Sequence, residues 1–343
     1  MRVLVAMSGG VDSSVAAALL LEEGHDVVGV TLKLWGGASD SGCCSVADVE
    51  DARRVAQQLD IDHWVFSFTD DFDERVVTPY AEAHAAGRTP NPCVECNRHL
   101  KFGRLLDRAS QLGFDALATG HHARVAVAGG RPRLLRGRDA AKDQSYVLHM
   151  LGVDELAQCR FPVGELTKDQ VRERARTLGL RTAAKPDSQD VCFVTSTGGR
   201  AAFLGPRIDL HPGRVVDTSG AEVGRVDAVE LVTVGQRRGM GGGGTERRYA
   251  LSVDPATATV VAGRAEDLLT DHVDLDDLAW HDGPASGPVE VDAQCSAHGR
   301  PVPVTVEGTT VRFASPHRRI APGQSVVFYR GDQVVGGGTC GPH

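Results

Sequence analysis

The chain has 343 residues, of which 41% are hydrophobic and 24% charged, and its formal net charge is −8. This composition excludes a disordered chain, and no apolar run is long enough to cross a bilayer. The acidic balance does not itself indicate a nucleic-acid binder, although basic residues gathered on one face can still bind a polyanion. Eight cysteines in a chain this long do not suggest the disulfide framework of a small secreted domain, so we expect a cytoplasmic protein without membrane contact.

The first part of the chain alternates short apolar runs with amphipathic ones, a pattern typical of strand–helix units around a parallel sheet. We expect strands at residues 2–7, 27–34, 63–68 and 116–120. We expect helices at residues 12–23, 47–59, 71–86, 99–112 and 168–178. The last of these follows a capping box, Thr167-Lys168-Asp169-Gln170. A loop with Pro90, Asn91, Pro92 and Cys93 separates the third helix from the fourth.

After residue 204 the pattern changes to glycine-rich, β-branched segments that break every eight to twelve residues or so, as in small β-domains and barrels. The chain is too long for one core, so two or three domains are expected. We predict a Rossmann-like catalytic α/β domain with a helical extension at residues 1–200. A central β-domain at 201–270 and a C-terminal β-barrel-like domain at 271–343 follow it.

A glycine–serine segment, Ser8-Gly9-Gly10-Val11-Asp12-Ser13-Ser14, joins the first strand to the first helix. Its glycines let successive N–H groups point at one anion, and the helix N-terminus adds partial positive charge. It is not a Walker A loop, because no Gly-Lys-Ser/Thr ends it. An isolated string of this kind is usually only a serine-capped turn, but its place at the start of an α/β domain favours nucleotide binding.

This segment resembles the pyrophosphate loop of the ATP-pyrophosphatase group, which adenylates substrates by cleaving ATP between the α and β phosphates. That group includes GMP, NAD and argininosuccinate synthetases and the tRNA thiolases. Later motifs distinguish among them, at residues 89–97, 101–103, 118–123, 142–146, 185–193 and 234–239. In this order, and over nearly the whole chain, the motifs resemble those of the bacterial tRNA-specific 2-thiouridylases.

The resemblance implies ATP-dependent 2-thiolation of the wobble uridine, position 34, in the anticodon stem-loop of tRNA. The uracil C2 oxygen would be adenylated, and a cysteine persulfide would then attack the carbon, with release of AMP and pyrophosphate. Mg²⁺ would neutralise phosphate charge. A sulfur-relay protein or a cysteine desulfurase would be the sulfur donor.

The resemblance also assigns roles to the cysteines. Cys192 matches the position of the persulfide and Cys96 the nucleophilic partner, so that a transient Cys96–Cys192 disulfide would form. Cys93 replaces the aspartate of the best-known family version, and a general acid–base role there is not carried over. Cys93, Cys96 and Cys192 are also three thiolates that could hold a [4Fe-4S] cluster with one open iron site. We rank persulfide chemistry first, the cluster second, and zinc last.

Other positions match ligand contacts of the family. The ATP-binding positions are Ala6, Met7, Ser8, Gly9, Gly10, Val11, Asp12, Ser13, Leu32 and Gly120. The tRNA-binding positions are Asn91, Pro92, Cys93, His121, Lys142, Asp143, Gln144 and Gln324. Without the resemblance, the sequence leaves two interpretations of His121 and His122, either polar residues at a strand end or a pair of metal ligands. The metal pair is disfavoured, because neighbouring side chains on a strand point to opposite faces.

Two alternatives stay open. A pyrophosphate-loop amidotransferase or ligase acting on a small molecule would need an ammonia-delivering glutaminase, and it gives no reason for Cys96 and Cys192. A non-catalytic RNA-binding module would carry a vestigial loop, whereas the segment from Ser8 to Ser14 is intact.

Overall fold

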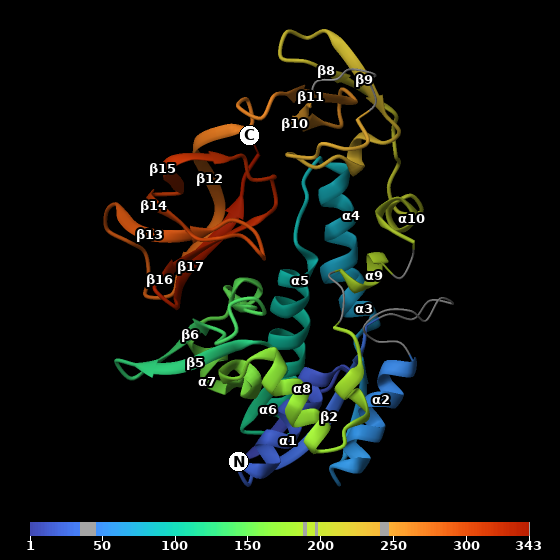
Figure 1. Cartoon of the computed structure of the whole chain (residues 1–343), viewed down its shortest axis with the longest axis vertical. Coiled ribbons are helices and arrows are strands. Elements are labelled where there is room, and N and C mark those ends of the chain that lie inside the picture. Colours follow the sequence, from blue (N-terminus) through green and yellow to red (C-terminus); the bar gives the residue numbers. More distant parts are fainter. Residues whose placement is uncertain (35–45, 188–190, 196–197, 241–246, 343) are drawn as a thin grey trace. The chain divides into compact units, whose positions relative to one another are not determined.

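The computed structural model describes residues 1–34, 46–187, 191–195, 198–240 and 247–342, with the exception of the side chains of Cys192 and Thr195 (Figure 1). The chain divides into two compact units. Unit 1 consists of residues 1–76, 92–197 and 332–334, and unit 2 of residues 77–91, 198–331 and 335–343. No helix in the described ranges is long and apolar enough to span a membrane.

Unit 1 contains a five-stranded sheet in which all neighbouring strands run parallel. The spatial order is β3-β2-β1-β4-β7, formed by β1 (Arg2–Ala6), β2 (Asp26–Lys33), β3 (His63–Ser67), β4 (Ala116–Thr119) and β7 (Cys159–Arg160). Val3, Leu4 and Val5 of the central strand are fully buried, as expected for a parallel strand that is covered on both faces. The predicted α/β domain with a parallel sheet is therefore confirmed.

Three helices contribute apolar side chains to the core of unit 1, namely α1 (Val11–Glu22), α2 (Val46–Gln58) and α8 (Lys168–Thr177). The predicted capping box opens α8, because the Thr167 hydroxyl accepts from the backbone N–H of Gln170 and the Gln170 side chain accepts from the backbone N–H of Thr167. Shorter helical segments of this unit are α3 (Thr69–Phe72), η1 (Asp73–Val77), η3 (Ser145–Leu148), α7 (Val153–Gln158), η4 (Pro162–Glu165), η5 (Arg181–Ala184) and α9 (Cys192–Thr195).

The helix expected at residues 99–112 begins earlier than the sequence pattern suggests. Residues 92–111 form one helical run of α5 (Pro92–Glu95), the π-helical η2 (Cys96–Leu105) and α6 (Leu106–Gln111). Proline is tolerated at the first helical position, where the missing N–H would have no intrahelical partner. Cys93 and Cys96 consequently lie on a helix, and Cys93 does not belong to the predicted loop.

A hairpin that the sequence analysis did not foresee follows β4. It pairs β5 (Ala123–Ala128) with β6 (Arg131–Arg136) in antiparallel register. Gly129 and Gly130 form its two-residue turn with φ of +59° and +76°, which is the backbone that such a tight turn requires.

Unit 2 is mostly β, as predicted. One sheet has the order β10-β11-β8-β9, from β8 (Gly213–Val216), β9 (Glu222–Val226), β10 (Tyr249–Asp254) and β11 (Thr259–Gly263). A second set comprises β12 (Leu269–Trp280), β13 (Val289–Gln294), β14 (Val302–Glu307), β15 (Thr310–Arg318), β16 (Ser325–Arg330) and β17 (Gln333–Cys340). Because β12 pairs with both β15 and β17, these strands close into a barrel. Helical segments of unit 2 are α4 (Thr78–Ala85), α10 (Arg200–Leu204) and η6 (Val229–Leu231).

A buried histidine makes unit 2 sensitive to pH. His84 of α4 is 1% exposed, and its Nδ1 donates to the backbone carbonyl of Glu230 at 3.1 Å. Burial disfavours the charged imidazolium and lowers the pKa of His84 from 6.5 to about 4. As the pH falls below 6.5, the unfolded chain therefore takes up a proton that the folded unit does not.

We predict that unit 2 loses stability as the pH falls from about 6.5 to about 4, and that His84→Gln removes this loss. Between pH 7 and pH 4.5 the His84 contribution should change the free energy of unfolding by about 2–3 kcal/mol, since one pKa unit corresponds to about 1.4 kcal/mol. Urea unfolding of both proteins at the two pH values measures the difference. Equal losses in the wild type and the variant would contradict the prediction.

Candidate active site

The carboxyl edge of the parallel sheet brings the predicted nucleotide-binding positions of unit 1 together. Ala6 ends β1 and Met7 follows it, Leu32 lies near the end of β2, and Gly120 directly follows β4. Since β1 is the neighbour of both β2 and β4, these three strand ends are adjacent. In sheets of this class, ligands bind beyond the carboxyl ends of the strands, where the strand order reverses.

The loop between β1 and α1 is held by its own serines. The Ser8 N–H donates to Ser13 Oγ at 3.1 Å, and the hydroxyls of Ser13 and Ser14 donate to the Gly10 carbonyl at 3.2 and 2.8 Å. Gly10 is the N-cap of α1, and no side-chain cap is found there among the described residues. The first N–H groups of α1 therefore have no intrahelical acceptor and can bind an anion.

Two glycines allow close packing around this loop. Gly9 has a φ of +71°, and a Cβ at this position would lie 2.3 Å from the Asp48 carbonyl oxygen. A Cβ on Gly120 would lie 2.5 Å from the backbone nitrogen of Ser13. Side chains at these positions would separate the loop from α2 and from the end of β4.

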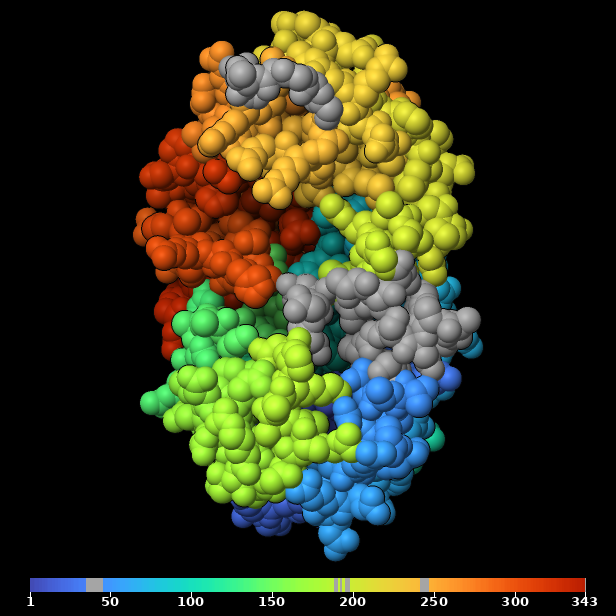
Figure 2. Space-filling view, turned by 45° about the vertical axis from the view of Figure 1, so that its right-hand side comes forward, coloured from blue at the N-terminus to red at the C-terminus, as the bar shows by residue number. Residues whose placement is uncertain are grey.

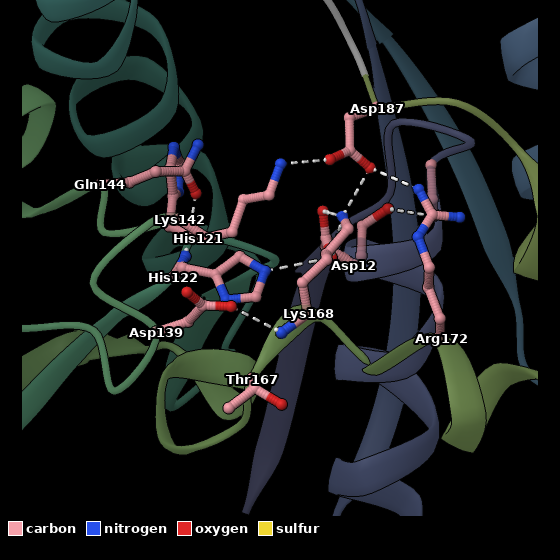
Figure 3. A network of polar contacts seen from close by, with 12 residues as sticks. Asp12, His121, His122, Asp139, Lys142, Gln144, Thr167, Lys168, Arg172 and Asp187 are labelled. Atoms are coloured by element: carbon pink, nitrogen blue, oxygen red, sulfur yellow. Dashed lines mark hydrogen bonds and ion pairs between the residues drawn. The ribbon is translucent and has the colours of Figure 1, made fainter. Parts of the chain in front are cut away.

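Asp12, in the first turn of α1, is the centre of a polar network (Figure 3). Its two carboxylate oxygens lie 2.8 and 2.7 Å from Lys168 Nζ, and Oδ1 lies 3.2 Å from His122 Nε2. Burial alone would raise the pKa of Asp12, but the hydrogen bonds from His122 and Lys168 outweigh it and lower the pKa. An ionised Asp12 only accepts, so His122 Nε2 carries the proton of this bond.

Asp187 joins the same network from the segment after η5. Its Oδ1 lies 2.8 Å from Lys168 Nζ and 2.7 Å from an Arg172 nitrogen, and its Oδ2 lies 2.8 Å from Lys142 Nζ (Figure 3). Burial acts to raise the pKa of Asp187, but the lysine hydrogen bonds lower it far below its usual value. Lys168 and Asp187 are functional residues that no sequence pattern predicted, although Lys168 belongs to the capping box and Asp187 to the motif at residues 185–193.

A second lysine, Lys185, binds the loop and α2. Lys185 Nζ donates to the Gly9 carbonyl at 2.9 Å and to the carboxylates of Asp48 and Asp51 at 2.7 and 2.8 Å. The Arg181 side chain pairs with Asp51 at 3.0 Å. Figure 2 shows the blue segment of α2 beside the yellow-green segment that precedes residue 187. Ion pairs thus fix the loop, α2 and this segment to one another.

The predicted tRNA-binding positions of unit 1 differ in how far they are buried. His121 is 8% exposed as a residue. Its ring lies near those of Phe102 and Phe161 and shares a 2.7 Å hydrogen bond with Thr119. Burial lowers the pKa of His121 well below its usual value, so this ring is neutral. Lys142, in contrast, is 42% exposed at its side chain while it pairs with Asp187.

Asp143 and Gln144 organise the backbone after the hairpin. Asp143 accepts from the N–H groups of Gly137 and Ser145 and pairs with Arg136 at 2.8 Å. Gln144 Oε1 accepts from the His122 N–H at 2.9 Å. Their contact with tRNA stays a prediction.

Three consecutive predicted tRNA-binding positions, Asn91, Pro92 and Cys93, belong partly to unit 2 and partly to unit 1. Asn91 is the last residue of the first segment of unit 2, whereas Pro92 and Cys93 begin α5 in unit 1. Gln324, also of unit 2, hydrogen-bonds the Thr89 carbonyl. These positions too remain predictions as tRNA contacts.

The cysteine positions lie on two helices of unit 1. Cys93 and Cys96 are half-buried and three positions apart, so they share one helix face. Cys192 begins α9, and its side chain lies outside the described part of the structure. No group of three or more His, Cys, Asp or Glu residues suited to a metal ion occurs among the described side chains, a set that omits Cys192.

Helix α3 touches both elements that carry these cysteines. Phe193 of α9 packs edge-on against Phe72 of α3, with ring centroids 5.5 Å apart. Arg104 of η2 pairs with Asp71 of α3 at 3.0 Å. The helices of Cys96 and Cys192 therefore have a common neighbour.

Comparison with known proteins covers almost the whole chain. Residues 1–196 match a family described as the tRNA methyl transferase HUP domain, residues 201–264 the corresponding PRC-barrel domain, and residues 270–340 the aminomethyltransferase beta-barrel domain. The tRNA-specific 2-thiouridylase MnmA of Chloroflexus aurantiacus is 47% identical, over 98% of this chain and 97% of that protein. The protein of the same name from Cutibacterium acnes is 45% identical, over 99% and 97%. A solved 4-thiouridine synthetase–RNA complex with bound ATP is 17% identical, with a TM-score of 0.38 and coverage of 59% of this chain and 46% of that one.

We predict that Gly9→Ala weakens ATP binding by at least about tenfold, because the added Cβ meets the Asp48 carbonyl and displaces the loop. Gly24→Ala is the matched control. Gly24 has a φ of +79°, but no neighbouring atom lies within 4 Å of the position that a Cβ would take. This variant should therefore show only the conformational cost, about 1 kcal/mol of stability, with normal ATP binding. Calorimetric titration with ATP distinguishes the two variants, and normal ATP affinity in Gly9→Ala would refute the assignment of the loop.

Proposed function

The chain belongs to the family of tRNA-specific 2-thiouridylases, and we propose that it replaces the C2 oxygen of the wobble uridine with sulfur by means of the residues assembled in unit 1. It is an ATP-using tRNA sulfurtransferase. The observation that carries the proposal is the serine-braced loop at the carboxyl edge of the sheet. The first N–H groups of α1 lack intrahelical acceptors there, and ionised Asp12 lies in the same turn.

Adenylation is the first step of the proposed reaction. The uracil O2 attacks the α-phosphorus of ATP, the bond to the β-phosphate oxygen breaks, and pyrophosphate leaves. The N–H groups at the start of α1 bind the phosphate oxygens and stabilise the charge that develops on them. Asp12 is an oxygen donor of the kind that Mg²⁺ prefers, and Mg²⁺, when bound, supplies neutralisation of phosphate charge.

Sulfur transfer is the second step. The terminal sulfur of a Cys192 persulfide attacks C2, and AMP leaves with the former O2. The Cys96 thiolate then attacks Sγ of Cys192, the persulfide S–S bond breaks, and its electron pair stays on the new thiocarbonyl sulfur. The product is a Cys96–Cys192 disulfide, which a thiol reductant must open before the next cycle. Their common neighbour α3 supports an approach of the two cysteines.

An iron–sulfur cluster is the second candidate for the sulfur step. Cys93 and Cys96 share one helix face and fit two cysteine ligands, and Cys192 is the candidate for the third. A bound cluster would supply an open iron site for sulfide.

The partners follow from the chemistry. The positions Asn91, Pro92, Cys93, His121, Lys142, Asp143, Gln144 and Gln324 are proposed contacts of the anticodon stem-loop. The sulfur donor is proposed to be a persulfide-carrying protein, either a relay protein or a cysteine desulfurase. We also propose a cytoplasmic location for the reaction. The small-molecule ligase alternative is not favoured, because the similarity to the thiouridylases includes both β regions.

We predict that Cys96→Ser and Cys192→Ser each abolish 2-thiouridine formation while tRNA binding is kept, because each removes one sulfur of the transfer step. Cys295→Ser is the control, since burial raises the pKa of Cys295 to about 12 and keeps it a thiol. Mass analysis of tRNA nucleosides after incubation with ATP, Mg²⁺ and a sulfur source measures the product. Full thiolation by either active-site variant would rule out the persulfide mechanism.

The cluster hypothesis predicts a different result for Cys93. If three cysteines hold a cluster, anaerobically purified protein should be brown and contain iron, and Cys93→Ser should lose both properties. If the persulfide mechanism holds, both the wild type and Cys93→Ser are free of iron, and Cys93→Ser, which changes only a proposed tRNA contact, still forms 2-thiouridine. Colourless, iron-free and active enzyme would exclude the cluster.

A further inference from the structure

Three cationic side chains of unit 1 converge on one carboxylate, that of Asp187 (Figure 3). Lys142 Nζ lies 2.8 Å from its Oδ2, while Lys168 Nζ and an Arg172 nitrogen lie 2.8 and 2.7 Å from its Oδ1. The Lys168 ammonium is also bonded to both oxygens of Asp12, in the first turn of α1. The cationic cluster of Lys142, Lys168 and Arg172 therefore lies directly beside the nucleotide loop.

The cationic cluster is held in place by contacts other than those with Asp187. The Asp139 carboxylate accepts from the backbone N–H of Lys168 at 2.9 Å, and the Asp139 carbonyl accepts from that of Lys142 at 3.0 Å. The Arg172 side chain also donates to two backbone carbonyls at the end of η5, at 3.0 and 3.1 Å. The three cations can therefore stay together around another anion that takes the place of the Asp187 carboxylate.

The charge and exposure of Asp187 suit such an exchange. Burial acts to raise the pKa of Asp187, but the lysine hydrogen bonds lower it far below its usual value, so the side chain is an anion at neutral pH. The side chains of Lys142 and Asp187 are 42% and 32% exposed, so a solute can reach this side of the cluster and water can solvate a released carboxylate. A phosphate group carries more negative charge than a carboxylate and accepts the same charge-assisted hydrogen bonds.

We propose that the cationic cluster binds the pyrophosphate that leaves during adenylation, and that the Asp187 carboxylate competes with pyrophosphate for these cations and so promotes its release. The inference rests on the proposed function, because it takes the neighbouring loop to bind ATP. It adds three side chains to the N–H groups of α1 as ligands of the leaving group, and it gives Asp187 a part in product release.

The backbone of tRNA is another source of phosphate groups, and Lys142 is itself a proposed tRNA contact. Pyrophosphate is favoured because the Lys168 side chain is only 10% exposed and is bonded to the first turn of α1, where the phosphates of ATP are proposed to bind. A small anion that takes the place of the Asp187 carboxylate reaches the Lys168 ammonium, whereas an RNA backbone contacts only the exposed side of the cluster.

The first experiment measures the binding of pyrophosphate to the full-length protein by calorimetry in the presence of Mg²⁺. Asp187→Asn should bind pyrophosphate at least about threefold more tightly than the wild type, because the competing charge is removed while other contacts keep the cations in place. A purely structural role of Asp187 predicts the opposite sign, since loss of the carboxylate would then weaken the cluster and its affinity for pyrophosphate. Unchanged or weaker binding by folded Asp187→Asn overturns the competition.

Asp51→Asn is the control for a general loss of negative charge near the loop. Asp51 is 20% exposed and pairs with Lys185 and Arg181, so its replacement removes one charge without releasing the cationic cluster. Its affinity for pyrophosphate should stay within about 1.5-fold of that of the wild type. Equal tightening in Asp51→Asn and Asp187→Asn also overturns the competition.

The cations are tested by their own variants. Lys142→Gln and Arg172→Gln should each weaken pyrophosphate binding by at least about fivefold, because each removes a charge-assisted hydrogen bond. Arg53→Gln is the matched control, since Arg53 is 60% exposed on α2 and pairs with Glu50 outside the cluster, and it should bind pyrophosphate as the wild type does. These variants carry the test if Asp187→Asn does not fold, and wild-type affinity in both cluster variants overturns the inference.

Amine labelling distinguishes pyrophosphate from RNA as the ligand. The acetylation of Lys142 by acetic anhydride is followed by peptide mass analysis, with the α-amino group of Met1, at the opposite end of β1 from the loop, as the internal reference. Saturating pyrophosphate with Mg²⁺ should slow the acetylation of Lys142 by at least about threefold, because a bound anion covers the ammonium. Protection by an anticodon stem-loop alone, and not by pyrophosphate, overturns the inference.

The outcomes separate this inference from the proposed function. Wild-type protein that binds ATP, with none of the predicted effects on pyrophosphate, overturns the inference and leaves the proposed function intact. Wild-type protein that binds no ATP overturns the proposed function, and the inference with it.

Discussion

The charge pairing around Lys168 is the constraint on which the active site of unit 1 depends. A nearly buried ammonium is stable only if carboxylates surround it, and loss of one partner from a fully buried pair costs about 3–5 kcal/mol. Here the cost is smaller, because Asp12 and Asp187 are 29% and 32% exposed and water can reach them. The Lys168 ammonium therefore needs its carboxylate partners, whereas water can solvate the two carboxylates if a contact is lost. A site that binds a polyanion needs this freedom at its carboxylates.

The same pairing bears on how an acidic chain can offer a binding site for phosphate. Part of the acid that gives the net charge of −8 is engaged internally, because Asp48 and Asp51 pair with Lys185, and Asp12 and Asp187 pair with Lys168. These carboxylates do not face the solvent as an unbroken negative field, because each of them has a lysine ammonium beside it. Net charge is thus a poor guide to the field at this edge of the sheet.

The features that the sequence predicted depend on residues close together in the chain, and the features that it did not predict depend on contacts between distant residues. The loop from Ser8 to Ser14, the alternation of strands and helices and the capping box at Thr167 each depend on neighbouring residues, and the structure has all three. The Asp12–Lys168 pair joins positions 156 residues apart, which no periodicity can reveal. The helix start at Pro92 was missed because two prolines suggested a loop, although the second proline occupies the first helical position, where its missing N–H has no cost. The resemblance named the cysteines, but the geometry that relates Cys96 to Cys192 lies partly outside the described side chains.

The two consecutive histidines after β4 have different environments, one charged and one aromatic. His122 donates to Asp12 and belongs to the charged network, whereas His121 is neutral beside Phe102 and Phe161. A shared metal ion would require both rings on one side, and their different partners argue against it. For the His121 ring to reach RNA, the aromatic contacts around it would have to open. In the structure at hand the ring instead anchors the end of β4, where Gly120 must pass so close to Ser13 that no side chain fits. The aromatic packing of His121 and the hydrogen bond from His122 to Asp12 therefore both hold the backbone after β4 against the nucleotide loop.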